Sequence, residues 1–379
     1  MLRLPRFLVL MMALAFVLAA CGTSSESPEE SEDASESEPA AGESEPATGE
    51  WTPEYVDGVL QPLPDGFPNE PITLTVADLP GSSDGVYARH TQTALRNISP
   101  VPVEVLDLGD QGSYPTWEAL QFTLDQTGGD QGYYPMVHVV PGLVIDTLTV
   151  DLENELDVSL EDDIHFLNIT ESTPFILLTR LDAPWGTSFE DMIEYAKANP
   201  GTVKYVSRSP GSTGYLSMER VKLVLDVEFD QRAGGTHDEN ISAVGAGEMD
   251  IVMTQITNAL SHYEAGAVEV LAFTGSARVG EPWEDVPSFA EVGLPNEPWA
   301  QNRGWLVHNS VPDLHKAWLT ELFRAVQEDE EYRASRLTLP GVVLEDPPLT
   351  TEEVDELVVS SITAAEPTIR ELNLHWDQQ

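Results

Sequence analysis

Two short turns rich in glycine and hydroxyl side chains carry the clearest chemistry in this 379-residue sequence. One reads Ser207-Arg208-Ser209-Pro210-Gly211-Ser212-Thr213-Gly214, and the other reads Pro80-Gly81-Ser82-Ser83-Asp84. The first N–H groups of a helix lack partners within it and carry partial positive charge, and glycine lets a ligand come close to the backbone. The two turns therefore predict sites for an anion. For the longer turn the alternative is an ordinary strand-to-helix connection with Ser212 as the N-cap.

The elements that must position these turns alternate along the chain. Apolar runs predict strands at 72–76, 101–108, 134–140, 175–179, 203–206, 249–253, 268–273 and 305–307, with a further short strand within 226–236. Helical spacing predicts helices at about 84–97, 116–127, 188–199, 238–245, 256–265, 313–328 and 350–373, and one that begins near Ser212. Such alternation favours sheets with parallel strands, covered by helices on both faces. No regular element is predicted for the acidic insertion 143–163.

The first fifty residues predict a secretory signal followed by a disordered linker. Residues 1–21 contain Arg3, Arg6 and an apolar run, which is typical of a secretory signal and too short for a stable membrane span. The ending Leu18-Ala19-Ala20-Cys21 resembles a bacterial or archaeal lipobox, which implies a lipid on Cys21. A plain secretory signal is the alternative. Residues 22–50 hold ten acidic and no basic residues, a composition that predicts a disordered, self-repelling linker.

The charge balance excludes some classes of partner. The formal net charge is −47, with 65 acidic and 18 basic residues. A chain without a basic patch is not expected to bind nucleic acid or to lie on anionic lipid. Cys21 is the only cysteine, so no internal disulfide is possible. We interpret the acidity as halophilic-like, because concentrated salt screens self-repulsion.

Several motifs occur in the same order as in a known family. They are Pro80-Gly81-Ser82-Ser83-Asp84 with Arg89, Gln131-Gly132-Tyr133-Tyr134, Ala196-Lys197-Ala198-Asn199-Pro200-Gly201 before Ser207-to-Leu216, Gly247-Glu248-Met249-Asp250-Ile251-Val252-Met253, and Asp285-Val286-Pro287-Ser288-Phe289-Ala290-Glu291-Val292-Gly293. Over about residues 70–375 the chain resembles the solute-binding proteins of tripartite tricarboxylate transporters, the TctC/Bug family, in a lipoprotein form.

The resemblance implies an α/β fold of the two-lobed, hinge-closing periplasmic-binding-protein type (type II, or Venus flytrap), with a mixed, mostly parallel sheet in each lobe. We expect one lobe to comprise 51–170 and 281–379, and the other 171–280. The resemblance also implies an extracytoplasmic receptor, lipid-anchored to the cell membrane through Cys21. It would capture a small organic carboxylate between the lobes and pass it to the large and small membrane subunits of a transporter.

The predicted ligand-binding set combines both turns with three neighbouring positions. It consists of Gly81, Ser82, Ser83, Asp84, Gly142, Arg208, Ser209, Gly211, Ser212, Thr213, Gly214, Asp250 and Thr254. Asp84 is unusual beside a carboxylate, because like charges repel. We expect it to cap its helix; holding a ligand ammonium or hydroxyl is the alternative. Arg208 is either a second carboxylate-binding group or a solvated surface residue.

The sequence departs from the family pattern at several places. Arg208-Ser209-Pro210 replaces a Ser-Gly in the second turn, and Asn302-Arg303 stands where the family has an aromatic pair before Gly304. His237-Asp238-Glu239 marks another departure, but three adjacent side chains rarely converge on one ion, so no metal or other cofactor is predicted.

Two functions other than transport remain open. A ligand-sensing lipoprotein of the same fold cannot be separated from a transport receptor by sequence. An extracytoplasmic hydrolase is disfavoured, because Gly211-Ser212-Thr213-Gly214 lacks the Gly-x-Ser-x-Gly spacing and neither His237 nor His262 has motif support as a base. We therefore predict a binding protein and not an enzyme.

Overall fold

The computed structural model describes residues 51–78, 80–109, 115–126, 129–208, 212–275, 278–294 and 300–379. The predicted signal, Cys21, the acidic linker, Ser209 and Gly211 lie outside the described residues. Trp51–Gln379 form one compact unit. Among the described helices, none is both long enough and apolar enough to cross a membrane.

The larger of two sheets has six strands in the order β13-β6-β12-β5-β3-β4. Their bounds are β3 Ile72–Val76, β4 Val103–Asp107, β5 Met136–Val140, β6 Ile164–Thr173, β12 Gln301–His308 and β13 Val343–Leu349. β3 pairs in parallel with β4 and β5, whereas β12 is antiparallel to β5 and β6, and β13 is antiparallel to β6. A short hairpin, β1 Tyr55–Val56 and β2 Val59–Leu60, precedes this sheet.

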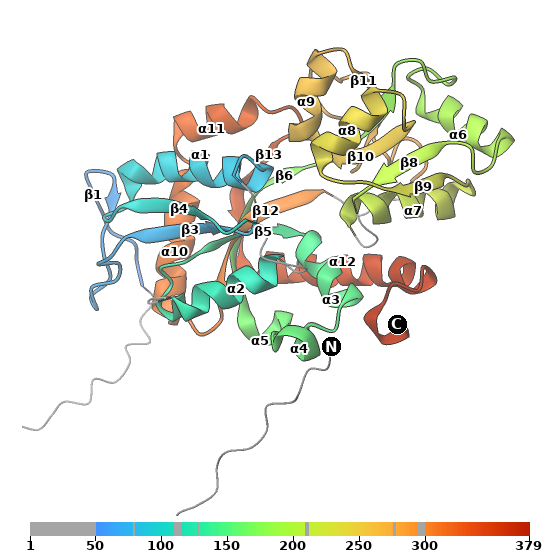
Figure 1. Cartoon of the computed structure of the whole chain (residues 1–379). Helices are drawn as coiled ribbons and strands as arrows, with labels where there is room; N and C mark the ends of the chain where they lie inside the picture. Colours follow the sequence, from blue (N-terminus) through green and yellow to red (C-terminus); the bar gives the residue numbers. More distant parts are fainter. Residues whose placement is uncertain are drawn as a thin grey trace, which may run out of the picture. The chain divides into compact units, whose positions relative to one another are not determined.

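Helices cover both faces of the larger sheet (Figure 1). One face carries α1 Ser83–Ile98, α10 Asp313–Val326 and α11 Glu330–Leu337; the other carries α2 Pro115–Asp125, α3 Gly142–Thr149 and α12 Thr351–Glu371. Each strand contributes side chains to the cores on both faces of the sheet, because successive strand side chains point to opposite faces. On β12, for example, Trp305 and Val307 pack with α1 and α10, and Leu306 packs with α3 and α12.

The smaller sheet has five strands in the order β11-β7-β10-β8-β9. Their bounds are β7 Phe175–Arg180, β8 Lys204–Ser207, β9 Asp230–Ala233, β10 Ile251–Gln255 and β11 Val268–Phe273. α6 Phe189–Ala198 and α7 Thr213–Leu225 cover one face, and α8 His237–Gly245 and α9 Ile256–Glu264 cover the other. Along β7, Phe175 and Leu177 enter the first core while Ile176 and Leu178 enter the second.

Two expectations about the sheets need correction. Both sheets are mixed, as predicted, but among the described strands three of the five ladders in the larger sheet and two of the four in the smaller are antiparallel, so they are not mostly parallel. β6 was not predicted at all, although it pairs with β12 and β13.

The acidic insertion forms α3, α4 Leu152–Leu156 and α5 Leu160–Asp163. Two short 3-10 helices, η1 Gly129–Gln131 and η2 Trp376–Gln378, complete the described elements.

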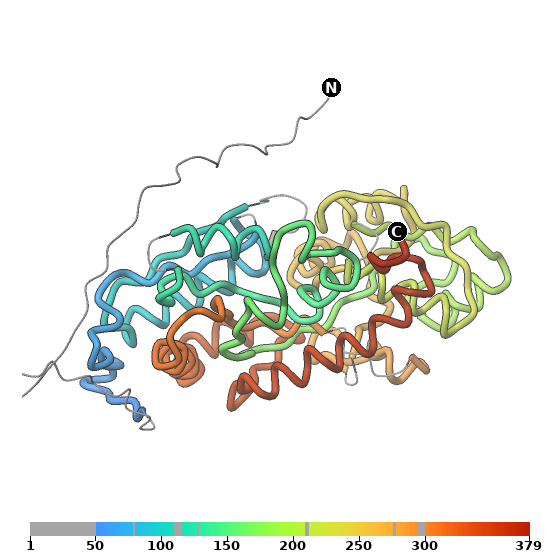
Figure 2. Tube along the Cα trace, turned by 90° about the horizontal axis from the view of Figure 1, so that it is seen from below, coloured from blue at the N-terminus to red at the C-terminus, as the bar shows by residue number. Residues whose placement is uncertain are grey.

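The two sheets adjoin at one edge of each. β6 ends at Thr173 and β7 begins at Phe175, so Pro174 alone separates them. Thr173 pairs with Gln301 in the larger sheet, and Phe175 pairs with Gln255 in the smaller sheet. A hydrogen bond of 2.8 Å from Phe175 N to Thr274 Oγ1 ties this crossing to the end of β11. Helix α12 contacts α3 and also α7, and Figure 2 shows it extending toward α7.

Candidate functional site

Four helices begin at the edge where the sheets adjoin. α1 and α3 follow β3 and β5, and α7 and α9 follow β8 and β10. In open α/β sheets, ligands bind in the crevice outside the carboxyl ends of parallel strands. The helix N-termini also provide backbone N–H groups for an anion there. This edge is therefore the candidate site.

The first turn uses its hydroxyl to begin α1. Gly81 has a φ of +89°, a conformation that favours glycine. Ser82 is the N-cap, because its Oγ accepts from Gly85 N at 3.1 Å. The prediction that Asp84 caps this helix is therefore wrong. Asp84 is the second residue of the helix, where a carboxylate complements the helix dipole.

Asp84 forms an ion pair with a residue from the other end of the chain. Arg303 on β12 donates from Nε to Asp84 Oδ1 at 2.8 Å and from Nη1 to Glu171 Oε1 at 2.8 Å. Arg336 on α11 donates to both oxygens of Glu171, at 2.7 and 2.8 Å. Both guanidinium groups also lie over the Tyr87 ring, 5.8 and 5.6 Å from its centre. The pKa of Glu171 is lowered because the attraction of the two cations outweighs the effect of burial.

Ser83 connects the first turn to the smaller sheet. Its Oγ donates to Gln255 Oε1 at 2.8 Å and accepts from Arg303 Nη2 at 3.2 Å. Gln255 is the last residue of β10. The first turn of α1 thus lies against the end of β10 in the smaller sheet.

The second turn begins α7 in the same manner. Ser212 is its N-cap and accepts from Tyr215 N at 3.4 Å, which confirms the ordinary capping role considered from sequence. A Cβ at Gly214 would lie 3.0 Å from Met253 O, so Gly214 lets the helix pack closely on β10. Leu216 is buried in the same apolar cluster as Leu143 of α3. Helix α7 also contacts α12, so it meets a helix of the larger sheet, as Ser83 of α1 meets β10 of the smaller sheet.

Arg208, His237 and Thr254 lie near one another beside this turn. Arg208 is exposed, and its charge together with burial lowers the pKa of His237 to about 4, burial being the larger cause. His237 Nδ1 and Thr254 Oγ1 are 2.8 Å apart. Thr254 is fully buried, so it supports His237 and does not face the crevice directly.

The remaining two predicted positions differ in where they lie. Gly142 is the first residue of α3, and a Cβ added there would meet no atom within 4 Å. Asp250 precedes β10 at its other end, where it accepts from Arg180 Nε at 2.7 Å and from Lys204 N at 2.8 Å. A five-residue strand is about 16 Å long. Asp250 therefore lies at the opposite end of β10 from the edge where the sheets adjoin. Its contacts there are structural, and it is not part of the candidate site.

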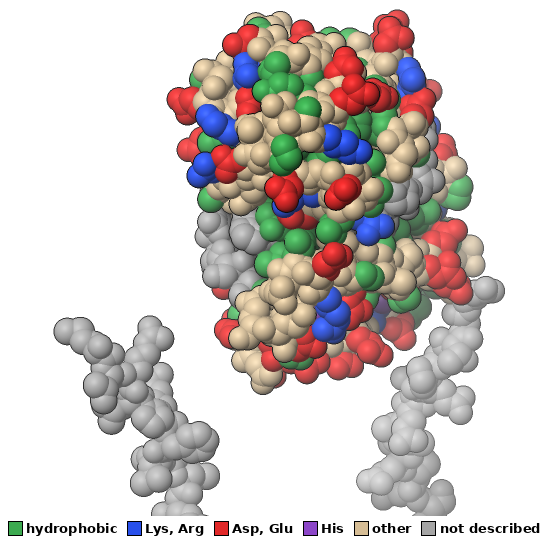
Figure 3. Space-filling model, turned by 90° about the vertical axis from the view of Figure 1, so that its right-hand side faces the viewer, with side chains coloured by type: hydrophobic (Ala, Val, Ile, Leu, Met, Phe, Trp, Pro, Cys, Tyr) green, Lys and Arg blue, Asp and Glu red, His purple; other side chains and the backbone are tan. Residues whose placement is uncertain are grey.

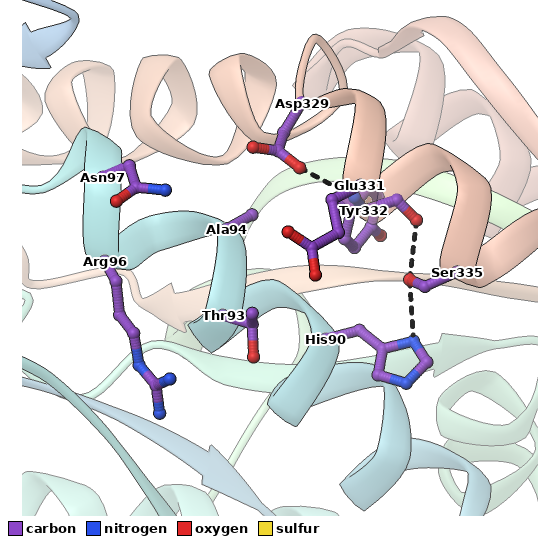
Figure 4. Close-up of a pocket in the computed structure, with 9 residues that line it drawn as sticks. All are labelled: His90, Thr93, Ala94, Arg96, Asn97, Asp329, Glu331, Tyr332 and Ser335. Atoms are coloured by element: carbon purple, nitrogen blue, oxygen red, sulfur yellow. Dashed lines mark hydrogen bonds between the residues drawn. The ribbon is translucent and has the colours of Figure 1, made fainter.

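A cavity of about 390 Å³ lies elsewhere, between α1 and α11 (Figure 4). His90 of α1 bonds Ser335 of α11 across it, at 3.2 Å between Nδ1 and Oγ. Asp329 already caps α11 by accepting from Tyr332 N at 2.7 Å, and Glu331 adds another negative charge. A small carboxylate is poorly matched to this acidic helix start, so the cavity is not the candidate site.

The charges of the surface side chains do not by themselves favour the binding of an anion. Acidic side chains are spread over the face in Figure 3, with fewer Lys and Arg among them. Within the described residues, no group of three or more His, Cys, Asp or Glu is arranged to hold a metal ion. Binding of an anion must therefore rely on helix N-termini and hydroxyl groups at the crevice.

Sequence reasoning assigned no role to Arg303, which the structure places beside the first turn of α1. Its signal was visible as the replacement of an aromatic pair before Gly304, but no role followed from it. Gln255 and Gln301, at the facing strand ends, were also missed. Neither belongs to a recognisable motif; only strand pairing brings them to the edge where the sheets adjoin.

Solved structures define the class of fold. The structure of periplasmic binding protein BugD is similar with a TM-score of 0.67 and 17% identity, covering 82% of this chain and 100% of that one. A Rhodopseudomonas palustris protein solved with adipate has a TM-score of 0.66 and 19% identity, with 80% and 97% covered. MatC of the same organism, solved with bound malate, has a TM-score of 0.64 and 19% identity, with 80% and 100% covered. The chain has the fold of periplasmic binding proteins.

The family follows from sequence comparison. The model of the tripartite tricarboxylate transporter family receptor (TctC) matches residues 142–334, just over half of the chain. A UPF0065 protein of Bordetella pertussis is 25% identical over 232 residues, which is 61% of this chain and 68% of that protein. BugT of the same organism is 25% identical over 248 residues, with 62% and 70% covered. The chain belongs to the TctC family of tripartite tricarboxylate transporter receptors.

Proposed function

We propose that this protein is an extracytoplasmic receptor that binds a small organic carboxylate between its two sheets and delivers it to the membrane subunits of a tripartite transporter. The observation that carries the proposal is that α1 and α7 each contact elements of the other sheet at the edge where the two sheets adjoin. Ser83 donates to Gln255 of the smaller sheet, and α7 contacts α12, with Leu216 buried in the apolar cluster that α3 and α12 share. The adipate and malate bound by two proteins of this fold support a carboxylate ligand.

The proposed ligand contacts come from both turns. The N–H groups of Ser83 and Asp84, those at the start of α3 beside Gly142, and those of Thr213 and Gly214 would hold carboxylate oxygens, since helix N-termini favour anions. Arg208, which is exposed and directly follows β8, would add a positive charge beside the second turn. Ser209 and Gly211 remain part of the proposed set on the family motif alone. Closure of the lobes 51–170 with 281–379 onto lobe 171–280 would be favoured by contacts that only the closed state makes.

A ligand screen tests this function. The purified protein is heated with malate, adipate, succinate, citrate, benzoate and amino acids, each at 1 mM as an example concentration. A ligand at about 100 times its Kd stabilises the folded state by about 2.7 kcal/mol and raises the melting temperature. The ligand should be recovered unchanged after incubation, as expected of a receptor and not a hydrolase. A flat melting temperature across all carboxylates contradicts the proposal.

Membrane attachment is a separate proposal. We infer that Cys21 is lipidated after removal of residues 1–20 and that residues 22–50 hold the folded unit away from the membrane. The lipobox-like ending and the acidic composition support this. Mass spectrometry of the mature protein should show a diacylglyceryl group on Cys21, and Cys21→Ser should release the protein from membranes. An unmodified mature protein that still pellets with membranes contradicts the anchor.

A sensor that signals to another partner would bind the same ligands. Transport of the identified ligand by cells that express the membrane subunits, with and without this protein, separates the two functions. Uptake that is independent of this protein would favour the sensor.

A further inference from the structure

Asp84 is the exposed member of a cluster of four charges. The side chains of Arg303 and Arg336 are 1% exposed and that of Glu171 is fully buried, whereas 26% of the Asp84 side chain is exposed. Asp84 adjoins Ser83, whose hydroxyl contacts the smaller sheet. The exposed part of the cluster therefore adjoins the contact between α1 and the end of β10, where the ligand site is proposed.

The four charges balance. Two guanidinium groups face two carboxylates, so the cluster as a whole adds no net charge near the start of α1. Without Arg303, the Asp84 carboxylate would repel a ligand carboxylate held on the same helix turn. Arg303 thus removes the conflict that the sequence raised, while leaving Asp84 as a hydrogen-bond acceptor.

The two oxygens of Asp84 are used differently. Arg303 Nε donates to Oδ1 at 2.8 Å, and Ser83 Oγ is 3.5 Å from the same oxygen. Among the residues that the structure describes, none donates to Oδ2. An ionised carboxylate only accepts hydrogen bonds, so Oδ2 suits an N–H or O–H donor of a ligand.

We propose that Asp84, positioned by Arg303, selects carboxylic acids that carry a hydroxyl or ammonium group on the carbon next to the carboxyl group. The ligand carboxylate on the first N–H groups of α1 places that neighbouring donor beside Asp84, the second residue of the helix. This inference rests on the proposed function and names the ligand class for the same site. Asp84 contacts the ligand, and Arg303 acts as a positioning residue.

Ligand pairs that differ in one group test the selection. Calorimetric titration compares lactate with propionate, malate with succinate, and 2-hydroxyglutarate with glutarate; alanine, aspartate and glutamate are the amino members. A hydrogen bond to a charged group contributes about 1.5–3 kcal/mol, so the substituted acid should bind about 10- to 100-fold more tightly than its partner. The hydroxy and amino arms show which donor is preferred.

Asp84→Asn tests the residue itself. Arg303 would hold the amide oxygen, which turns the amide N–H group toward the ligand donor. The preference within the best amino pair should then fall below about threefold, because an ammonium group cannot accept from that N–H group, whereas a hydroxyl group can. The control is Asp191→Asn, another exposed acid in the first turn of a helix, α6, which should keep the wild-type preference. An unchanged preference in Asp84→Asn overturns the proposal.

The positioning role of Arg303 is tested by its effect on the ligand preference that Asp84 produces. Arg303→Gln should reduce the same preference, and combining it with Asp84→Asn should reduce it no further, because the two residues act together. Arg303→Lys, which keeps a cation, should restore part of the preference and serves if the glutamine variant does not fold. Additive losses overturn the positioning role. If unsubstituted acids bind as tightly as substituted ones, the selection fails while the receptor function stands; if no carboxylate binds, the receptor function fails.

Discussion

Arg303 and Asp84 are 219 positions apart in the chain, yet the guanidinium Nε and the carboxylate Oδ1 are 2.8 Å apart. The pair joins the start of β12 to the start of α1, and Arg303 continues the connection to Glu171. A single arginine therefore joins the first turn of the proposed ligand site to a buried ion pair inside the larger sheet.

Glu171→Gln should destabilise the protein. The change removes the carboxylate that neutralises Arg303 and Arg336, and breaking a buried pair costs about 3–5 kcal/mol. Urea unfolding measures the loss. Glu366→Gln, in the exposed pair with Arg370, should cost no more than about 1 kcal/mol. Equal losses of unfolding free energy in the two variants would show that the buried cluster stabilises the protein no more than an exposed ion pair does.

Ser212→Ala should affect both stability and binding. Loss of the N-cap costs about 1 kcal/mol of stability, and a weaker start to α7 should reduce carboxylate affinity by about 1–2 kcal/mol. Ser188→Ala removes an equivalent cap from α6, where Ser188 accepts from Asp191 N at 3.1 Å. It should cost similar stability without changing affinity. Calorimetric titration measures the carboxylate affinity of both variants. If Ser212→Ala binds as tightly as Ser188→Ala, Ser212 is not part of the site.

Gly142→Ala should bind less tightly while folding normally. A Cβ there meets no protein atom within 4 Å, so the structure tolerates it, but the methyl group would stand at the start of α3 where the ligand is proposed to lie. We expect a loss of affinity of roughly tenfold, comparable to one lost hydrogen bond. Gly280→Ala is the control, because its Cβ also meets nothing within 4 Å. An affinity equal to wild type would place the ligand away from α3.

His138 should make the protein less stable in acid. Burial lowers its pKa to about 4, from an ordinary value of 6.5, so the unfolded chain binds a proton between these values that the folded chain does not. Its contribution is therefore complete above about pH 6.5 and is lost as the pH falls toward 4, by up to about 3 kcal/mol. His138→Gln should flatten the fall in unfolding free energy between pH 6.5 and 4.5. An unchanged slope would show that His138 titrates normally.

Salt should stabilise the protein. With 65 acidic and 18 basic residues, repulsion opposes folding at low ionic strength, and at about 1 M salt the screening length is only about 3 Å. The free energy of unfolding should therefore rise between 0.1 and 3 M KCl. Urea titrations at fixed KCl concentrations measure this change. A constant or falling value would contradict the halophilic interpretation.

Local patterns predicted much of the fold. The caps at Ser188 and Ser212 follow from a hydroxyl residue directly before apolar helical spacing, and both are present. Strands such as β7 and β11 were predicted because they are apolar runs. The first turn was also recognised, although its cap is Ser82 and not Asp84.

Long-range pairing explains what was missed. β6 contains His165, Asn168 and Glu171, so it does not read as an apolar strand. Glu171 is buried only because arginines from two later elements reach it. Asp250 was placed in the site by its motif, but the direction of β10 puts it at the other end of the strand. Such relationships depend on strand order, which local spacing does not encode.

The bond between Phe175 N and Thr274 Oγ1 has a mechanical consequence. It fastens the passage through Pro174 to the chain leaving β11, and proline has a fixed φ with little torsional freedom. Two neighbouring chain segments are thus coupled at the point where the sheets join. If the proposed lobes rotate against each other, both segments would turn together at this junction, so Thr274→Val should loosen the coupling between them.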